Sequence, residues 1–108
     1  MAKLEKTLSG NFDEMLQKIE TGILKGSLSA TLEDTSDFSD GNARCAVRVF
    51  ERYSAFGQNR VSMNVTLFQS ADGPIRLSAI TSGGSQAVLF KINTFGEEAF
   101  LDTLKNII

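Results

Sequence analysis

Residues 27–93 of this chain alternate apolar and polar side chains with a period of two, and glycine-containing turn sequences interrupt the alternation. This pattern is the strongest constraint on the fold, because side chains at alternate positions of a strand lie on the same face of a sheet. Short strands that are joined by tight turns are typical of an antiparallel sheet with one buried face. The sequence therefore predicts an antiparallel meander as the centre of the fold.

Five strands follow from this alternation, and a loop over residues 35–42 separates the first of them, near 27–34, from the second. The fifth strand is expected near 87–93. The side chains predicted to face the core are, strand by strand, Leu28, Ala30 and Leu32; Cys45, Val47, Val49 and Tyr53; Val61, Met63, Val65 and Leu67; Ile75, Leu77 and Ala79; and Val88, Phe90 and Ile92.

Three turns set the expected strand registers. A two-residue hairpin loop at Gly83-Gly84 predicts the pairs Ala79–Val88, Leu77–Phe90 and Ile75–Ile92. A three-residue loop at 71–73, with Gly73 in the left-handed conformation, aligns Leu67 with Leu77. A turn centred on Gly57 predicts the pairs Tyr53–Val61 and Val49–Val65. All three turns agree with a single apolar sheet face.

Two amphipathic helices flank the strands. Residues 12–25 carry one apolar stripe, with Asn11 and Glu14 as a capping box and Gly26 as the stop. A second capping box, Thr94 with Glu97, predicts a helix over 95–108 whose last residues pack on the core. We therefore expect one domain over residues 1–108, an α+β two-layer sandwich in the order αβββββα with both helices on one sheet face.

Composition excludes several classes of function. The 108 residues include no histidine and one cysteine, so the usual catalytic triads, imidazole metal sites and multi-cysteine zinc sites are absent. The formal charge is −2 and the pI is near 5.0, which disfavours nucleic acid as a partner. No apolar run reaches the length of a membrane span, and the N-terminal residues do not resemble a signal peptide. We expect a cytoplasmic protein without a cofactor, a metal or a membrane partner.

All five arginines lie within residues 44–76. The acidic residues of this segment are Glu51 and Asp72, so the segment carries a formal charge of +3. The predicted register places them on the outward face of the sheet together with aromatic and amide side chains. Such a face suits a carboxylate, a phosphate or an acidic protein surface, although a merely solvated face is the simpler interpretation. The candidate binding face consists of Arg44, Arg48, Phe50, Arg52, Arg60, Asn64, Phe68 and Arg76.

The first functional hypothesis is a non-enzymatic interaction module that forms a homodimer through this face or through an edge strand. The alternative is a small-molecule binding protein with a cavity between sheet and helices for an apolar or anionic ligand. A third hypothesis, a hydrolase or isomerase that uses Glu51 and Tyr53, depends on whether these two residues line a pocket. No catalytic residue is assigned.

Three further motifs have simple structural interpretations. The segment from Ser82 to Gln86 could form an anion-binding nest, but a hairpin turn already explains its glycines. The acidic residues between Glu33 and Asp40 do not have the spacing of a calcium loop, so a solvated loop is favoured. Cys45 is expected to be a small buried apolar residue.

Two long segments resemble a known family. They are LSAITSGGSQAVLFKINTFGEEAFLDTL at 77–104 and RCAVRVFERYSAFGQNRVSMNVTLF at 44–68, and the opening Met1-Ala2-Lys3 is similar as well. Together they resemble a small bacterial family of domains of unknown function. The resemblance implies a bacterial cytoplasmic origin, and because that family has no assigned activity it implies no functional residue.

Overall fold

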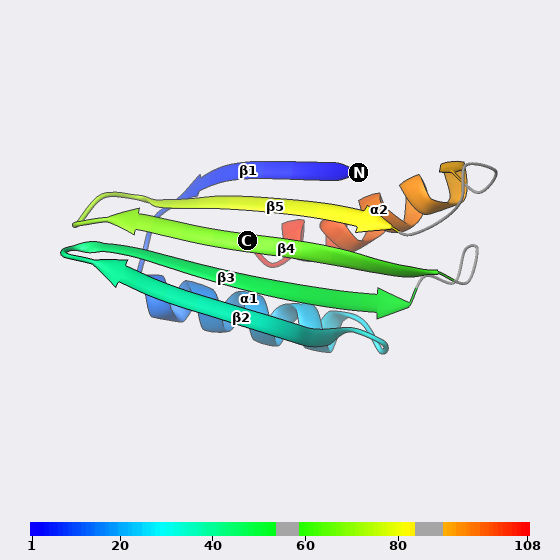
Figure 1. The fold of residues 1–108 in the computed structure, drawn as a ribbon, viewed down its shortest axis with the longest axis horizontal. Coiled ribbons are helices and arrows are strands. Elements are labelled where there is room, and N and C mark those ends of the chain that lie inside the picture. The colour runs from blue at the N-terminus through cyan, green and yellow to red at the C-terminus, as the bar shows by residue number, and fades with distance from the viewer. Residues whose placement is uncertain (54–58, 84–89) are drawn as a thin grey trace.

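The computed structural model describes residues 1–53, 59–83 and 90–108, with side chains omitted for 90–95. Figure 1 looks onto the sheet from the side opposite the helices. The elements in chain order are β1 (Ala2–Leu8), α1 (Phe12–Gly26), β2 (Thr31–Asp40), β3 (Ala43–Tyr53), β4 (Arg60–Ser70), β5 (Ile75–Gly83) and α2 (Phe90–Lys105).

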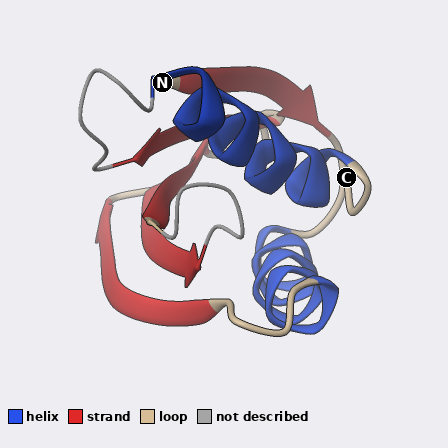
Figure 2. Cartoon of the chain, turned by 90° about the vertical axis from the view of Figure 1, so that its right-hand side faces the viewer, coloured by secondary structure: helices blue, strands red, loops and turns tan. Residues whose placement is uncertain are grey.

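The five strands form one antiparallel sheet in the order β1-β5-β4-β3-β2. Strands β2 to β5 are a meander, and β1 joins it at the outer edge of β5. Seen from the end, the two helices lie together on one side of the sheet (Figure 2). The predicted α+β class, the antiparallel sheet and the single helical layer are confirmed. The order along the chain is βαββββα and not the αβββββα that we predicted.

The first strand, β1, was not predicted from the sequence. In β1, Leu4 pairs with Ala79 and Leu8 with Ile75 on the side of the helices, while Lys3 and Glu5 lie on the other side. Charged residues are typical of an edge strand, because they discourage pairing with a further strand. The same charges made this alternation look like an unstructured segment.

The predicted strand near 87–93 is wrong for its described part, because residues 90–93 belong to α2. The place beside β5 is occupied by β1, so Ala79 pairs with Leu4 and not with Val88. Gly83 is the last residue of β5 and not part of a hairpin loop, and the predicted partners up to residue 89 lie outside the described residues. A short apolar run does not by itself distinguish a buried strand from a buried helix.

Strand β2 is also displaced from its predicted position. It covers Thr31–Asp40, so most of the segment expected as a loop is an edge strand with an irregular register between Leu32 and Asp34. Its serine, threonine and aspartate residues are common in turns, but on an edge strand they point to solvent and are tolerated.

The hairpin between β4 and β5 confirms one predicted register. Leu67 pairs with Leu77, and the inward residues of β4 are buried as expected. The left-handed position of the turn is occupied by Ala71, with φ 53°, and not by Gly73 as predicted.

The pairing of β3 with β4 differs by one residue from the prediction. Tyr53 pairs with Arg60 and Val49 with Asn64, where we expected Val61 and Val65. A shift of one residue moves every side chain of a strand to the opposite face of the sheet. Ala46, Arg48 and Phe50 therefore face the helices, and Cys45, Val47 and Val49 face outward. The Gly57 turn that we used to set this register lies outside the described residues.

Both helices bury their apolar sides against the sheet and against each other. Helix α1 matches the prediction, and the Glu14 amide donates a hydrogen bond to the Asn11 side chain at its N-terminus. Helix α2 begins earlier than predicted, so Thr94 is an internal residue and not a cap. The fully buried core residues between the layers include Ile19, Ile23, Phe50, Met63, Phe100 and Leu104.

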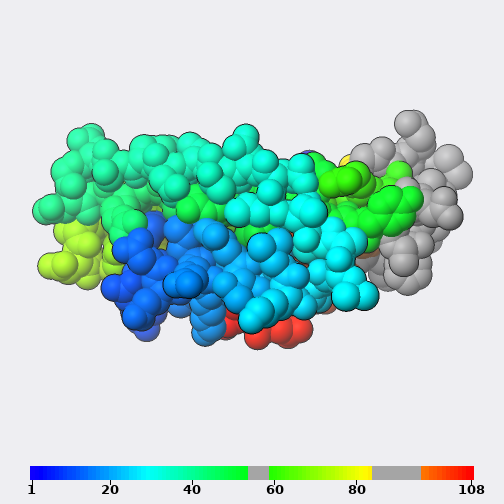
Figure 3. Space-filling view, turned by 90° about the horizontal axis from the view of Figure 1, so that it is seen from below, coloured from blue at the N-terminus to red at the C-terminus, as the bar shows by residue number. Residues whose placement is uncertain are grey.

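The C-terminal residues pack on α1, as the sequence predicted. Ile107 and Ile108 are partly buried against the core. A Cβ atom on Gly22 would lie 2.6 Å from Cδ1 of Ile107, so the glycine permits this close approach. Figure 3 shows α1 in blue between β2 in cyan and the C-terminal residues in red.

Candidate binding face

The structure divides the eight residues of the predicted binding face between the two sides of the sheet. Arg44, Arg48, Phe50 and Arg52 face the helices, whereas Arg60, Asn64, Phe68 and Arg76 face away from them. The prediction that they share one face is therefore wrong. The cause is the register of β3, which places its even-numbered residues inward.

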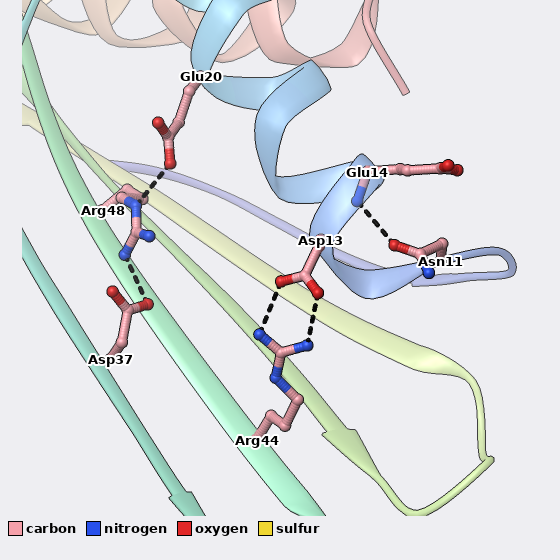
Figure 4. A network of polar contacts seen from close by, with 7 residues as sticks. All are labelled: Asn11, Asp13, Glu14, Glu20, Asp37, Arg44 and Arg48. Atoms are coloured by element: carbon pink, nitrogen blue, oxygen red, sulfur yellow. Dashed lines mark hydrogen bonds and ion pairs between the residues drawn. The ribbon is translucent and has the colours of Figure 1, made fainter.

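Arg44 holds the start of α1 against the sheet. Its Nη2 and Nη1 atoms donate hydrogen bonds to the two carboxylate oxygens of Asp13 at 2.7 and 3.1 Å (Figure 4). Its guanidinium carbon also lies 4.2 Å from the centre of the Phe12 ring. The hydrogen bonds from Arg44 lower the pKa of Asp13 below its usual value.

Arg48 is the most buried of these arginines, with 7% of its surface exposed. Its Nε donates to Glu20 of α1 at 2.8 Å, and its Nη1 donates to Asp37 of β2 at 2.9 Å, as Figure 4 shows. Burial would by itself lower the pKa of Arg48, but the hydrogen bonds to Asp37 and Glu20 outweigh it and raise the pKa. One side chain of β3 thereby connects the sheet to helix α1 and to the edge strand β2.

Arg52 completes the series on β3 and contacts the other helix. Its guanidinium carbon lies 4.7 Å from the centre of the Phe100 ring, and Nη1 donates to the Thr103 hydroxyl at 3.4 Å. Burial lowers its pKa. The three arginines of β3 thus connect both helices to the sheet, which gives them a structural role.

The face of the sheet that no helix covers is called here the open face. Its side chains form rows across the strands, because residues that pair in an antiparallel sheet lie on the same side. From β2 to β1, three of these rows are Phe38–Cys45–Phe68–Arg76–Thr7, Ser36–Val47–Thr66–Ser78–Glu5 and Asp34–Val49–Asn64–Ile80–Lys3.

Apolar side chains are concentrated on the open face. Phe38 is 62% exposed and Phe68 42%, and Tyr53 and Ile80 are also exposed there. Next to them lie Cys45, Val47 and Val49 of β3, which are half-buried. A sheet face that is only solvated usually carries polar residues, and a contiguous apolar patch marks an interaction surface.

The two arginines of the open face differ in their surroundings. Arg60 donates to Glu51 at 2.7 Å and lies 3.5 Å from Glu33. Arg76 is exposed and has no carboxylate within ion-pair distance among the residues that the structure describes. It is therefore the arginine whose charge is most available to an incoming group.

Two cavities adjoin Arg76 on the open face, and both are lined by Arg76 and Phe68. The larger, of about 450 Å³, also borders the hydroxyl-bearing residues Thr7, Thr66 and Ser78. The smaller, of about 240 Å³, extends to the β4–β5 turn at Gly73. Arg76 and Phe68 thus form the common wall of a hollowed surface.

A comparison with protein families finds a match over residues 1–108 to a family described as a family of unknown function, DUF6054. The chain belongs to DUF6054. Comparisons with curated proteins and with solved structures found no match. Membership of DUF6054 agrees with the resemblance noted in the sequence and assigns no activity.

Several other sequence predictions can be placed in this DUF6054 fold. Tyr53 was expected to face inward, but Tyr53 and Glu51 both lie on the open face, and Glu51 is paired with Arg60. Cys45 also lies on the open face and not in the core. Neither of the cavities beside Arg76 borders Glu51 or Tyr53.

The acidic residues between Glu33 and Asp40 lie in β2, and no cluster suited to a metal ion occurs among the described parts of the chain. In the segment from Ser82 to Gln86, the Gly83 amide donates to the Glu97 carboxylate at 2.8 Å, while residues 84–86 are outside the described ranges. In the segments that are described, no helix is long and apolar enough to cross a membrane.

Sequence reasoning missed several residues of the open face in this DUF6054 chain, among them Lys3, Thr7, Phe38, Val47 and Val49. Two signals could have found them. The alternation of Leu4 and Leu8 with charged residues predicts an edge strand, and a one-residue change in the Gly57 turn reverses the parity of β3.

Proposed function

We propose that this protein is an interaction module whose open sheet face binds a second copy of the same chain. The supporting observation is the apolar patch formed by Phe38, Cys45, Val47, Val49 and Phe68, which runs over β2, β3 and β4. Ile80 adds a separate exposed apolar side chain on β5. The other side of the sheet already has its covering layer of helices.

The size of the sheet suits a dimer interface. Five strands with a spacing of about 4.8 Å and a length of about nine residues cover roughly 24 × 30 Å. This is roughly 700 Å², close to the approximately 800 Å² that each partner of a standard interface buries. Two sheets of this kind can pack face to face with nearly aligned strands.

Charge complementarity favours a second copy as the partner. Asp34 and Lys3 lie at opposite ends of one row on the open face. A two-fold axis parallel to the strands would place β1 of one copy opposite β2 of the other. Lys3 of each copy would then face Asp34 of the other, so the contact would form twice.

The space between sheet and helices gives less support to the alternative of an internal ligand cavity. Phe50, Met63 and Phe100 are fully buried there and fill the layer together with the residues of α1. The cavities beside Arg76 lie at the open face, on the other side of the sheet.

Sedimentation of the wild-type chain and two variants tests the proposal. At about 50 µM, where a dimer of micromolar affinity is mostly formed, we expect the wild type to sediment as a dimer. Phe38→Glu places a charge in the patch and should give a monomer. Leu28→Glu is the matched control, because Leu28 is fully exposed in the turn after α1, which is not part of the sheet, and its replacement should leave the dimer intact. A monomeric wild type contradicts the proposal.

A charge exchange tests the proposed axis. Lys3→Asp and Asp34→Lys each create two like-charge contacts, and each should weaken the dimer by about three- to tenfold. The double variant restores opposite charges and should return the affinity to within about twofold of the wild type. If the two single effects simply multiply, the proposed axis is wrong.

A further inference from the structure

The hollow beside Arg76 has the features of a small ligand site. Arg76 pairs with Phe68 on one side and with Thr7 on the other, so the three side chains lie in one row of the open face. In the next row, Ser78 lies between Thr66 and Glu5. A cavity of about 450 Å³ borders all of these residues, and this volume is within the range of small-molecule sites.

The polar groups of this hollow are available to a ligand. Among the described residues no ion pair involves Arg76, whereas Arg44, Arg48 and Arg60 are each paired with a carboxylate. The Thr66 hydroxyl already donates to Asn64, so it is not counted among the donors for a ligand.

We propose that Arg76 binds the carboxylate of a small organic acid whose apolar part lies against Phe68. A guanidinium presents two parallel N–H donors that match the two oxygens of a carboxylate. The ring of Phe68 offers an exposed apolar surface beside it. Glu5 and Lys6 border the same cavity, so with Arg76 its charged residues have a net charge of +1. This charge matches a monoanion better than a doubly charged phosphate.

Because Phe68 and Arg76 border both cavities, tight binding should require a ligand with an apolar group as well as a carboxylate. Phe68 and Arg76 border both the larger hollow and the smaller one near Gly73 and Pro74. A ligand that contacts both residues therefore lies across the wall. A carboxylate without an apolar group uses only the arginine, and it should bind more weakly.

A titration of the isotope-labelled chain, followed by amide chemical shifts, tests this site with three probes. Benzoate should bind with a dissociation constant of about 1 mM and shift the amides of β4 and β5 around Phe68 and Arg76. Acetate and inorganic phosphate should each bind at least about fivefold more weakly. Equal binding of the three probes, or tighter binding of phosphate, overturns the proposal.

Two variants identify the residues that are responsible. Arg76→Gln should weaken benzoate at least about tenfold, while the matched control Arg60→Gln, on the same face but in a pair with Glu51, should change it less than about twofold. Phe68→Ser should bring benzoate to the affinity of acetate. Unchanged binding by Arg76→Gln overturns the proposal.

Phe68 belongs both to this site and to the patch proposed to bind a second copy, so the ligand and the second copy would compete for it, but each proposal can fail without the other. The titration is repeated with Phe38→Glu, whose altered side chain borders neither cavity beside Arg76. Benzoate binding to that variant with the wild-type pattern of shifts supports the ligand site whatever the state of association. If the wild type binds benzoate and Phe38→Glu does not, the claim that Arg76 and Phe68 are sufficient for binding is overturned.

Discussion

The two faces of the sheet use the same residue types in different ways. On the helix side, Arg44, Arg48 and Arg52 contact carboxylates or rings of the protein itself. On the open side, Arg76 lies beside a hollow with no carboxylate partner among the described residues. A concentration of arginine in a sequence therefore does not identify a binding face.

The aromatic residues repeat this contrast. Phe50 is completely buried between sheet and helices, whereas Phe68 is 42% exposed on the open face. The first ring stabilises the fold of the monomer. The second ring leaves apolar surface in water, which gains free energy only when a ligand or another chain covers it.

The largest expected effect is the difference in unfolding free energy between variants of Phe50 and Phe68. Phe50→Ala removes a fully buried side chain and should lower the free energy of unfolding by about 4 kcal/mol. Phe68→Ala should lower it by about 1 kcal/mol when dilute protein is unfolded with urea. Similar losses at the two positions would contradict the assignment of the faces.

A smaller effect is expected for the arginines. Arg48→Ala leaves Glu20 and Asp37 without their partner and should destabilise the chain by about 2 kcal/mol, a moderate loss because both carboxylates retain access to water. Arg76→Ala should change stability by less than about 0.5 kcal/mol. Thermal unfolding followed by circular dichroism measures both, and a large loss for Arg76→Ala would assign that residue to the fold.

The smallest expected effect is the pH dependence of the stability that Asp13 contributes. The pKa of Asp13 in the folded chain is below its usual value of 3.8, mainly because Arg44 donates hydrogen bonds to it. Asp13 therefore stabilises the folded state above the unfolded-state pKa, and this contribution is lost as the pH falls through the lower, folded-state pKa.

Asp13→Asn should accordingly be less stable than the wild type at neutral pH, and the difference should shrink below about pH 4. Urea unfolding of both proteins at several pH values gives the comparison. A difference that stays constant down to about pH 2.5 would show that the carboxylate charge of Asp13 does not contribute.

The sequence was sufficient to predict the α+β class, helix α1 and the inward residues of β4, because each has a clear period and only one apolar face. It was not sufficient for β3, in which both parities carry apolar residues: Ala46 and Phe50 on one side, Val47 and Val49 on the other. When both faces of a strand are apolar, the hydrophobic pattern does not determine the register. The register then depends on the length of the connecting turn, which the sequence does not determine.

The same ambiguity limited the prediction of the site. Placing Arg76 and Phe68 on the outward face followed from β4 and β5 and is confirmed. Adding Arg44, Arg48 and Arg52 followed from the wrong parity of β3. The contribution of Thr7 could not be predicted, because β1 reaches β5 from the other end of the chain.

The reactivity of Cys45 measures the central claim directly, because this single thiol lies between Phe38 and Phe68 in one row of the open face. Its rate of modification by a thiol reagent should fall as the wild-type concentration rises from about 1 to about 200 µM and the open face becomes covered. In Phe38→Glu the rate should not depend on concentration. A wild-type rate that is constant over the whole range would contradict self-association through the open face.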